Sequence, residues 1–353
     1  MDDVAITISC HHSSIFKSVL PISVFLLVAS LGRAQPQEQR PLGVIDFFGS
    51  KGVNVDAVRM ALPVHVGDQL PAQITPSVDL QENVAAAVRQ AIGRDATDVG
   101  LVCCDDRQRW ILFIGLPGAS SRPIAYRLPP VSSMRLPKEV LQLDAEWGKA
   151  WMDAAAAGAT EDDSQGFALS SDPVLRSKQM AMREYAIGNE ALLKRALEQS
   201  SDARHRAIAA TALGYANASA GQVSALVQAS RDPNEGVRNN AVRSLAVIAR
   251  AKPELARQID ARAFIRLLTS GSWSDRNKGA MILMVLTERR DPAMLRELRA
   301  NALDALVEMA RWSSPGHAYF ARVLVGRIAG IEEPRLQQLV KEGRGDEIIA
   351  AIR

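Results

Sequence analysis

The sequence predicts a mainly α-helical protein in which a small α+β domain precedes a C-terminal α-solenoid of stacked helix pairs. The first observation is a repeat: Asp172, Asp202 and Asp232 are thirty residues apart, and apolar residues recur at helical spacing after each of them. Composition agrees, because aromatic residues make up only 5% of a chain that is 47% hydrophobic. Small aliphatic residues let helices approach closely, so this bias favours helix-on-helix packing over a large sheet.

Residues 1–34 are predicted to form a secretory signal peptide. An apolar run, residues 19–31, follows Lys17, and the small residues Gly32 and Ala34 precede a polar segment that begins at Gln35. The run is too short to span a bilayer comfortably, which favours export over a permanent anchor. The alternative is a buried strand or helix of the mature fold. We therefore expect a periplasmic or secreted protein without a stable membrane span after cleavage of the signal peptide.

Residues 41–117 are predicted to form the small α+β domain. The expected elements are a strand at residues 43–48, helices at residues 55–62 and 78–92, and two strands at residues 99–104 and 110–116. A tight polar connection, Asp105-Asp106-Arg107-Gln108, joins the last two strands. The element order is therefore β-α-α-β-β.

This order resembles a POTRA domain, a small periplasmic module of outer-membrane assembly and secretion proteins. The phrase VDAVRMALPVHVGDQL is similar to the part of those domains that leads from the first helix into a turn at Gly67 and Asp68. The resemblance implies protein binding, often by addition of a partner strand to an exposed sheet edge. The alternative is a domain that only packs on the helices. An unpaired edge in residues 43–48 or 99–116 would favour strand addition, and a covered edge would favour this capping role.

Cys103 and Cys104 are the only cysteines that follow the predicted signal peptide. Neighbouring residues of a strand point to opposite faces, and a vicinal disulfide would break the strand expected at residues 99–104, so we expect the two thiols not to pair with each other. They also lack the nearby histidine or second cysteine pair of a zinc site. At least one is expected to be small apolar filler, and a redox or thioether-forming role is the alternative.

Residues 118–137 are predicted to be a Pro-rich, partly extended linker, and residues 138–170 a connecting helix followed by an acidic loop. Trp147 and Trp151 are four residues apart and share a helix face, which we expect to pack against the first repeat. The alternative is a ligand-stacking pair. The acidic run at residues 161–163 lacks the alternating carboxylates and the closing glutamate of a calcium loop.

Residues 171–353 are predicted to form the solenoid. One apolar helix face stands out in residues 231–250, at Val237, Ala241, Leu245 and Ile248. Arg238 and Arg243 lie outside this face and, like the other charged residues, are expected on a solvated helix surface. The aligned core positions of the units are Ala181, Thr211 and Ala241, then Tyr185, Tyr215 and Leu245, then Ala186, Ala216 and Ala246. Further helices are expected at residues 273–286, 295–309 and 315–328, and residues 336–352 are predicted to be one last, capping helix.

This pattern resembles the HEAT-repeat family, and in particular its short-period, lyase-like bacterial branch. The features that carry the resemblance are Asp-Pro at the unit starts, Asp172 and Asp232, and the Val237-Arg238 pair in a first helix. The resemblance implies a curved scaffold with a protein-binding surface, and it does not imply an enzyme.

No catalytic, cofactor-binding or metal-binding residue is predicted. His65, His205 and His317 form no ligand pair, and the sequence contains no GxSxG, Walker or dinucleotide-binding pattern. The net charge of +3 is mild and the basic residues are interleaved with acids, so no nucleic acid is expected as a partner. We therefore predict a non-catalytic protein-binding scaffold or adaptor of the bacterial cell envelope. The alternatives are a HEAT-type lyase, or lyase accessory protein, of the cytoplasm and a purely structural adaptor.

Overall fold

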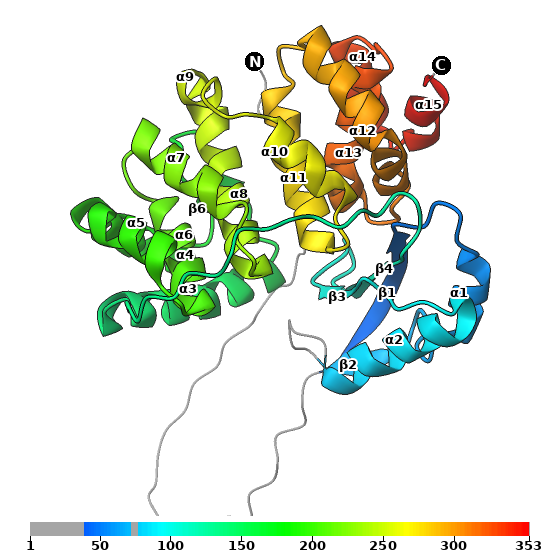
Figure 1. Cartoon of the computed structure of the whole chain (residues 1–353), viewed down its shortest axis with the longest axis horizontal. Helices are drawn as coiled ribbons and strands as arrows, with labels where there is room; N and C mark the ends of the chain where they lie inside the picture. The colour runs from blue at the N-terminus through cyan, green and yellow to red at the C-terminus, as the bar shows by residue number, and fades with distance from the viewer. Residues whose placement is uncertain (1–38, 72–76, 353) are drawn as a thin grey trace, which may run out of the picture.

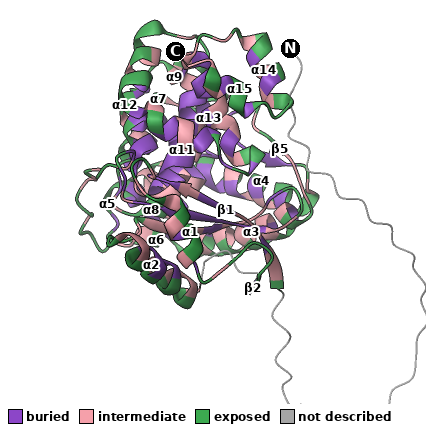
Figure 2. Cartoon of the chain, turned by 90° about the vertical axis from the view of Figure 1, so that its right-hand side faces the viewer, coloured by how far each residue is buried: buried purple, intermediate pink, exposed green. Residues whose placement is uncertain are grey.

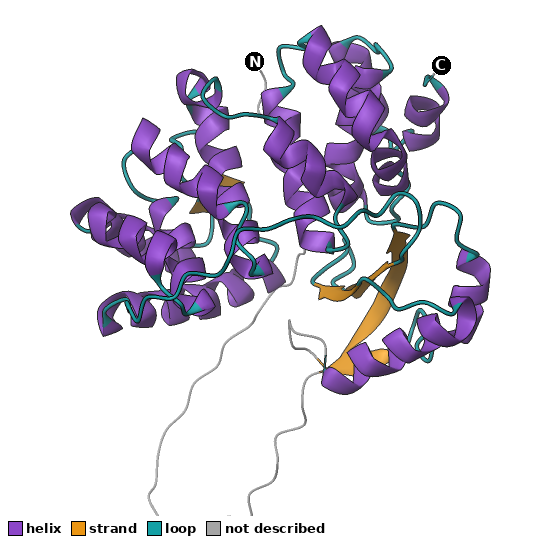
Figure 3. Ribbon diagram, viewed as in Figure 1, coloured by secondary structure: helices purple, strands orange, loops and turns teal. Residues whose placement is uncertain are grey.

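The structure is a computed structural model that describes residues 39–71 and 77–352. The predicted signal peptide, residues 1–34, lies outside the described residues. An α+β domain packs beside the C-terminal half of a helical solenoid, and the chain then returns along the solenoid to its first helices (Figures 1 and 3). The fold class is therefore the predicted one.

The α+β domain places two helices on one face of a four-stranded sheet. Its elements are β1 (Gln39–Phe48), α1 (Val55–Ala61), β2 (Gln69–Pro71), α2 (Val78–Ile92), β3 (Asp98–Val102) and β4 (Trp110–Gly115). The sheet order is β2-β1-β4-β3, with β1 parallel to β4 and β3 antiparallel to it. Asn54 and Ser77 begin the two helices by accepting backbone N–H bonds. The short strand β2 is the one element that the sequence did not predict here.

The strand β4 is buried on both of its faces. Trp110, Leu112 and Ile114 pack in one core with α1 and α2, whereas Ile111 and Phe113 belong to the core of the solenoid. Every residue of β4 is buried. The solenoid thus covers the second face of the sheet, and buried residues continue from its helices into β1 (Figure 2).

The connecting helix α3 (Lys138–Ala156) packs against α4 (Pro173–Gly188), the first helix of the array. Trp147 and Trp151 contact Ala150, Ala154 and Leu175 in this seam, which confirms the predicted packing of the tryptophan pair on the first repeat. The acidic run contributes to a short hairpin, β5 (Glu161–Asp162) with β6 (Leu169–Ser170).

The solenoid has two layers of helices. The first-helix layer consists of α4, α6 (Ala203–Leu213), α8 (Glu235–Ala251), α11 (Trp273–Leu286) and α13 (Pro315–Ile328), each of which contacts the next. The second-helix layer consists of α5 (Glu190–Gln199), α7 (Ala220–Ala229), the short α9 (Pro253–Ala256), α10 (Arg262–Ile265) and η1 (Arg266–Thr269), then α12 (Pro292–Ala310) and α14 (Glu333–Lys341). Within the described residues, no helix is both long and apolar enough to cross a membrane.

The C-terminal end of the array differs from the prediction. The single helix expected at residues 336–352 is wrong, because α14 ends at Lys341 and a separate helix, α15 (Gly345–Ala350), follows. Gly343 separates them with a φ of +71°, a backbone conformation that favours glycine. The helical periodicity continued across this turn and concealed it.

A ladder of ion pairs runs along the solenoid, and its first two pairs join one unit to the next whereas its last two join the helices of one unit. Its members are Arg206–Asp232, Arg238–Asp275, Arg276–Glu308 and Arg327–Glu333. Arg238 is only 3% exposed and its Nε donates to Asp275 Oδ1 at 2.7 Å. The prediction that Arg238 lies on a solvated surface is therefore wrong. A carboxylate of the next unit lies within reach of its guanidinium, and the two-pronged bond offsets the cost of burying both charges.

Residues 118–137 form an extended strap that runs along this ladder (Figure 1). Three strap side chains bond to successive ladder carboxylates: Ser120 Oγ to Glu308 at 2.6 Å, Tyr126 Oη to Asp275 at 2.8 Å, and Arg127 Nη2 to Asp232 at 2.5 Å. The segment is extended, as the prolines predicted. It is also attached to the solenoid at one unit after another, which the sequence did not predict.

Candidate interaction surfaces

Glu308 of α12 joins the α+β domain to the solenoid. Its carboxylate accepts the backbone N–H groups of Gly49 and Ser50, at 2.9 and 3.0 Å, and the hydroxyls of Ser50 and Ser120, at 3.0 and 2.6 Å. Arg276 Nη1 lies 3.4 Å away. Burial lowers the pKa of Arg276 to about 10 against the opposing charge of Glu308. Several donors from both parts of the chain therefore converge on one carboxylate and fix the two parts together.

Aromatic rings form the second contact between the domain and the solenoid. The Phe113 ring lies 4.9 Å from the rings of Trp273 and Trp312 and 5.5 Å from that of His317, between ring centroids. Asp98 Oδ2 accepts the backbone N–H of Trp273 at 2.7 Å, and burial raises the pKa of Asp98 to about 6. This apolar contact and the Glu308 contact together make a rigid joint.

The two possible sheet edges, in residues 43–48 and 99–116, differ in whether other parts of the chain cover them. Residues 43–48 pair with β4 on one side, and on the other side Phe47 O accepts the Trp312 indole N–H at 3.2 Å while Asp46 bonds to Ser313. That edge is covered. The outer edge of β3, in contrast, carries no further strand in the part of the chain that the structure describes.

The three histidines lie in separate places. His65 is exposed beside Asp68, and the Nδ1 atom of His205 accepts the Leu136 N–H at 2.7 Å, which ties the strap to α6. His317 lies at the aromatic joint, 2.9 Å from Ser314 Oγ. Among residues 39–71 and 77–352, no three histidine, cysteine or acidic side chains are grouped as they would be to hold a metal ion.

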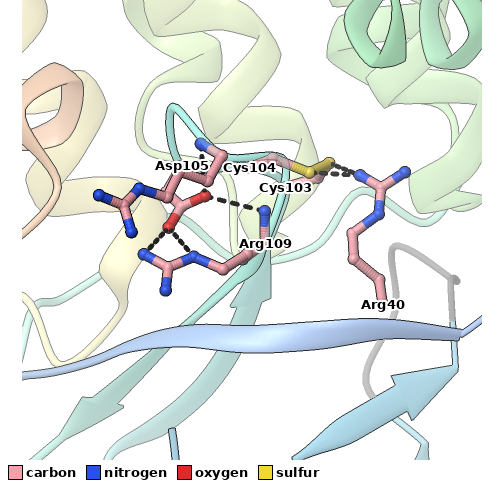
Figure 4. Close-up of a disulfide and its surroundings, with 6 residues drawn as sticks. Arg40, Cys103, Cys104, Asp105 and Arg109 are labelled. Atoms are coloured by element: carbon pink, nitrogen blue, oxygen red, sulfur yellow. Dashed lines mark hydrogen bonds and ion pairs between the residues drawn. A yellow bond between two sulfur atoms is a disulfide. The ribbon is translucent and has the colours of Figure 1, made fainter. Parts of the chain in front are cut away.

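Cys103 and Cys104 form a disulfide with each other (Figure 4). The prediction that these thiols do not pair is therefore wrong. Its premise fails because β3 ends at Val102, so the pair lies in the connection to β4 and breaks no strand. Arg40 Nη1 lies 2.9 Å from Cys103 Sγ, and Asp105 closes the connection by accepting the N–H of Arg109 at 2.8 Å.

The β5–β6 hairpin lies over basic side chains of α8. Glu161 forms an ion pair with Arg243, and Asp163 Oδ2 lies 3.0 Å from Arg250 Nη1. We call the surface of the first-helix layer that is turned away from the second-helix layer the first-helix face. A small cavity of about 40 Å³ lies against Arg243 on this face, between Trp147 and Tyr215. Arg243 is partly exposed, as predicted, but it is ion-paired to the acidic run.

A larger groove of about 680 Å³ lies between the strap and α10 and α12. Arg122, Ile124, Arg266 and Asn301 are among its lining residues, and an Arg262–Glu297 pair at 3.3 Å crosses one side. Its lining mixes both charges with apolar groups. This groove has the size of a small-ligand site, but its lining contains no cluster of side chains of one chemical type.

One comparison with known proteins supports the helical array. A family model described as HEAT repeats matches residues 189–284. No curated protein matches the chain. Among solved structures, a designed armadillo repeat protein is similar at 18% identity with a TM-score of 0.36, over 54% of this chain and 98% of that one. The matched residues extend from α5 into α11, and the C-terminal part of the chain has the fold of a HEAT-type repeat solenoid.

Proposed function

We propose that this chain is a non-catalytic scaffold that binds partner proteins in the bacterial cell envelope. The observation that carries the proposal is the network of contacts along the helical array. The ladder, the strap and the Glu308 contact hold a long helical surface in one shape. A surface fixed before binding loses little conformational entropy when a partner docks. Stacked repeats provide such extended surfaces, and their usual use is protein recognition.

The envelope location is supported by two features. The sequence of residues 1–34 has the pattern of a secretory signal peptide. In addition, Cys103 and Cys104 are joined as a disulfide, and disulfides persist in the periplasm and outside the cell but rarely in the cytosol.

We also propose that the α+β domain contributes a POTRA-like binding site at the outer edge of β3. The support is its element order and the position of β3 at the end of the sheet order β2-β1-β4-β3. A partner strand could pair there through main-chain hydrogen bonds. The covered second face of the sheet also supports a capping contact with the solenoid, and the two roles are compatible because they use different parts of the domain.

The proposal is tested in the native host by recovering the tagged full-length chain after in-cell crosslinking and fractionation. Mass spectrometry should find a mature N-terminus near Gln35 in the envelope fraction, together with a partner protein in reproducible proportion. An intact N-terminus in the cytosol would contradict the location. Absence of any partner above the level of an unrelated tagged envelope protein would contradict the scaffold role.

A further inference from the structure

Lys278 is a cation of the first-helix face that forms no ion pair with a described carboxylate. Its Nζ donates to Asn277 Oδ1 at 3.2 Å, and no described carboxylate lies within ion-pair distance of it. Arg243 and Arg250, the neighbouring cations of α8, are each matched by one carboxylate of the β5–β6 hairpin. The acidic hairpin therefore forms ion pairs with these two cations of α8 but not with Lys278 of α11.

The charges around Lys278 define a local positive excess. Burial and the positive charge of Arg243 together lower the pKa of Lys278 to about 8, although Glu161 opposes the decrease. The amine remains mostly protonated at neutral pH. Burial and the charge of Lys278 lower the pKa of His317 to about 4, so its imidazole is neutral there. Arg243 and Lys278 consequently share the single carboxylate of Glu161.

Two neutral donors of the same helix also lack acceptors. Asn277 is only 3% exposed, and its Nδ2 has no hydrogen-bond partner among the described residues. The indole Nε1 of Trp273, one helical turn earlier on α11, is likewise buried without a described partner. A buried donor left without an acceptor costs about 1–3 kcal/mol, so an incoming acceptor that reaches the Asn277 amide would recover a hydrogen bond as well as charge.

We propose that this part of the first-helix face binds a carboxylate of an extended acidic segment in a partner protein, with Lys278 as the charged donor and the Asn277 amide beside it. The β5–β6 hairpin indicates the kind of ligand, because it already lays an extended acidic stretch on the neighbouring helix. The inference rests on the proposed scaffold function and specifies that the partner protein presents an acidic segment.

The test uses the mature full-length chain and two capped synthetic probes, a labelled hexaglutamate peptide and a hexaglutamine peptide of equal length, with binding followed by fluorescence polarisation. Lys278→Gln removes the proposed donor. Lys138→Gln is the matched control, because it removes the same charge from an exposed position at the start of α3. Glu161→Gln removes the carboxylate that competes for Arg243.

The wild-type chain should bind hexaglutamate more tightly than hexaglutamine. Lys278→Gln should weaken hexaglutamate binding by about fivefold or more, as expected for loss of one charge-assisted bond, and Glu161→Gln should strengthen it. Lys138→Gln should stay within about twofold of wild type. Equal binding of both peptides, or equal effects of the Lys278 and Lys138 substitutions, would overturn the inference. A partner captured in cells equally well by wild type and Lys278→Gln would overturn this site while leaving the scaffold function intact.

Discussion

The carboxylate of Glu308 accepts the backbone N–H of Gly49 at 2.9 Å, although 259 residues separate the two in the sequence. The same carboxylate lies 3.4 Å from Arg276, whose side chain is fully buried. This single side chain therefore couples the turn that follows β1 in the α+β domain to the fourth unit of the solenoid.

Glu308→Gln should destabilise the protein by about 3 kcal/mol, because it leaves the buried Arg276 guanidinium without a counter-charge. Asp304→Asn is the control, since Asp304 pairs with Lys51 one turn earlier in the same interface but is 59% exposed. It should cost less than about 0.5 kcal/mol. Thermal and urea unfolding measure both changes. Equal losses of unfolding free energy in the two variants would contradict the claim that Glu308 stabilises the protein more than an exposed ion pair of the same interface.

Arg127→Ala should loosen the strap. Its guanidinium bonds to Asp232, which is fully buried, and loss of a hydrogen bond to a charged group costs about 1.5–3 kcal/mol. Arg135, whose Nε lies 3.9 Å from Asp202 with half of the side chain exposed, supplies the control Arg135→Ala. Hydrogen exchange should increase in residues 122–135 for the Arg127 variant alone. Unchanged protection there would contradict the account of the strap.

Glu333 should make stability depend on acid pH. Burial by itself would raise the pKa of this carboxyl, but bonds from Arg327 and Arg290 outweigh it and lower the pKa from 4.5 to about 2. A carboxyl with a lowered folded pKa contributes stability that is complete above pH 4.5 and is lost as the pH falls toward 2.

The melting temperature of wild type should therefore exceed that of Glu333→Gln by more at pH 6 than at pH 2.5. Circular dichroism melts at several pH values measure the difference. A difference that stays constant over this range would mean that the ion pair of Glu333 makes no pH-linked contribution.

The disulfide predicts the thiol content of the mature chain. If cleavage leaves an N-terminus near Gln35, Cys103 and Cys104 are its only cysteines. The unfolded, unreduced protein from the envelope should then give no free thiol with Ellman's reagent, and reduction should expose both. Two free thiols before reduction would contradict the disulfide and remove one support for export.

Local rules allowed most of the helices to be predicted. Residues 273–286 and 315–328 were expected to be helical, and α11 and α13 have these bounds. Asp172 and Asp202, found through the repeat, each cap a first helix by accepting backbone N–H bonds. Such caps and apolar periodicities are properties of a few consecutive residues, which is why one sequence suffices to find them.

The sequence contains a pattern that indicates the ladder, namely an arginine at one fixed position of successive first helices. Arg206 and Arg238 each lie four residues after a helix-capping residue, Asp202 and Asn234 respectively. Charge alone suggested a solvated surface, because the partner carboxylate belongs to another unit. A recurring arginine at one helical position would have indicated a repeated structural role.

The joint between the two parts could be predicted only in outline. The unbroken apolar run of β4 lacks the alternation of a strand with one solvated face, which favours burial on both sides. No local sequence pattern identifies Glu308 as the acceptor of the Gly49 N–H, or Lys278 as a cation that forms no ion pair with a described carboxylate. Those roles arise from groups brought together by the tertiary fold.

The most direct test of the central claim, that the first-helix face binds a partner protein, is site-specific photocrosslinking in the native host. A photoreactive amino acid at Met281, on α11 one turn after Lys278, probes the first-helix face, and one at Arg296, on the exposed side of α12, is the control. We expect one dominant crosslinked protein from position 281 and none from position 296. No product from either position, or the same products from both, would contradict the claim.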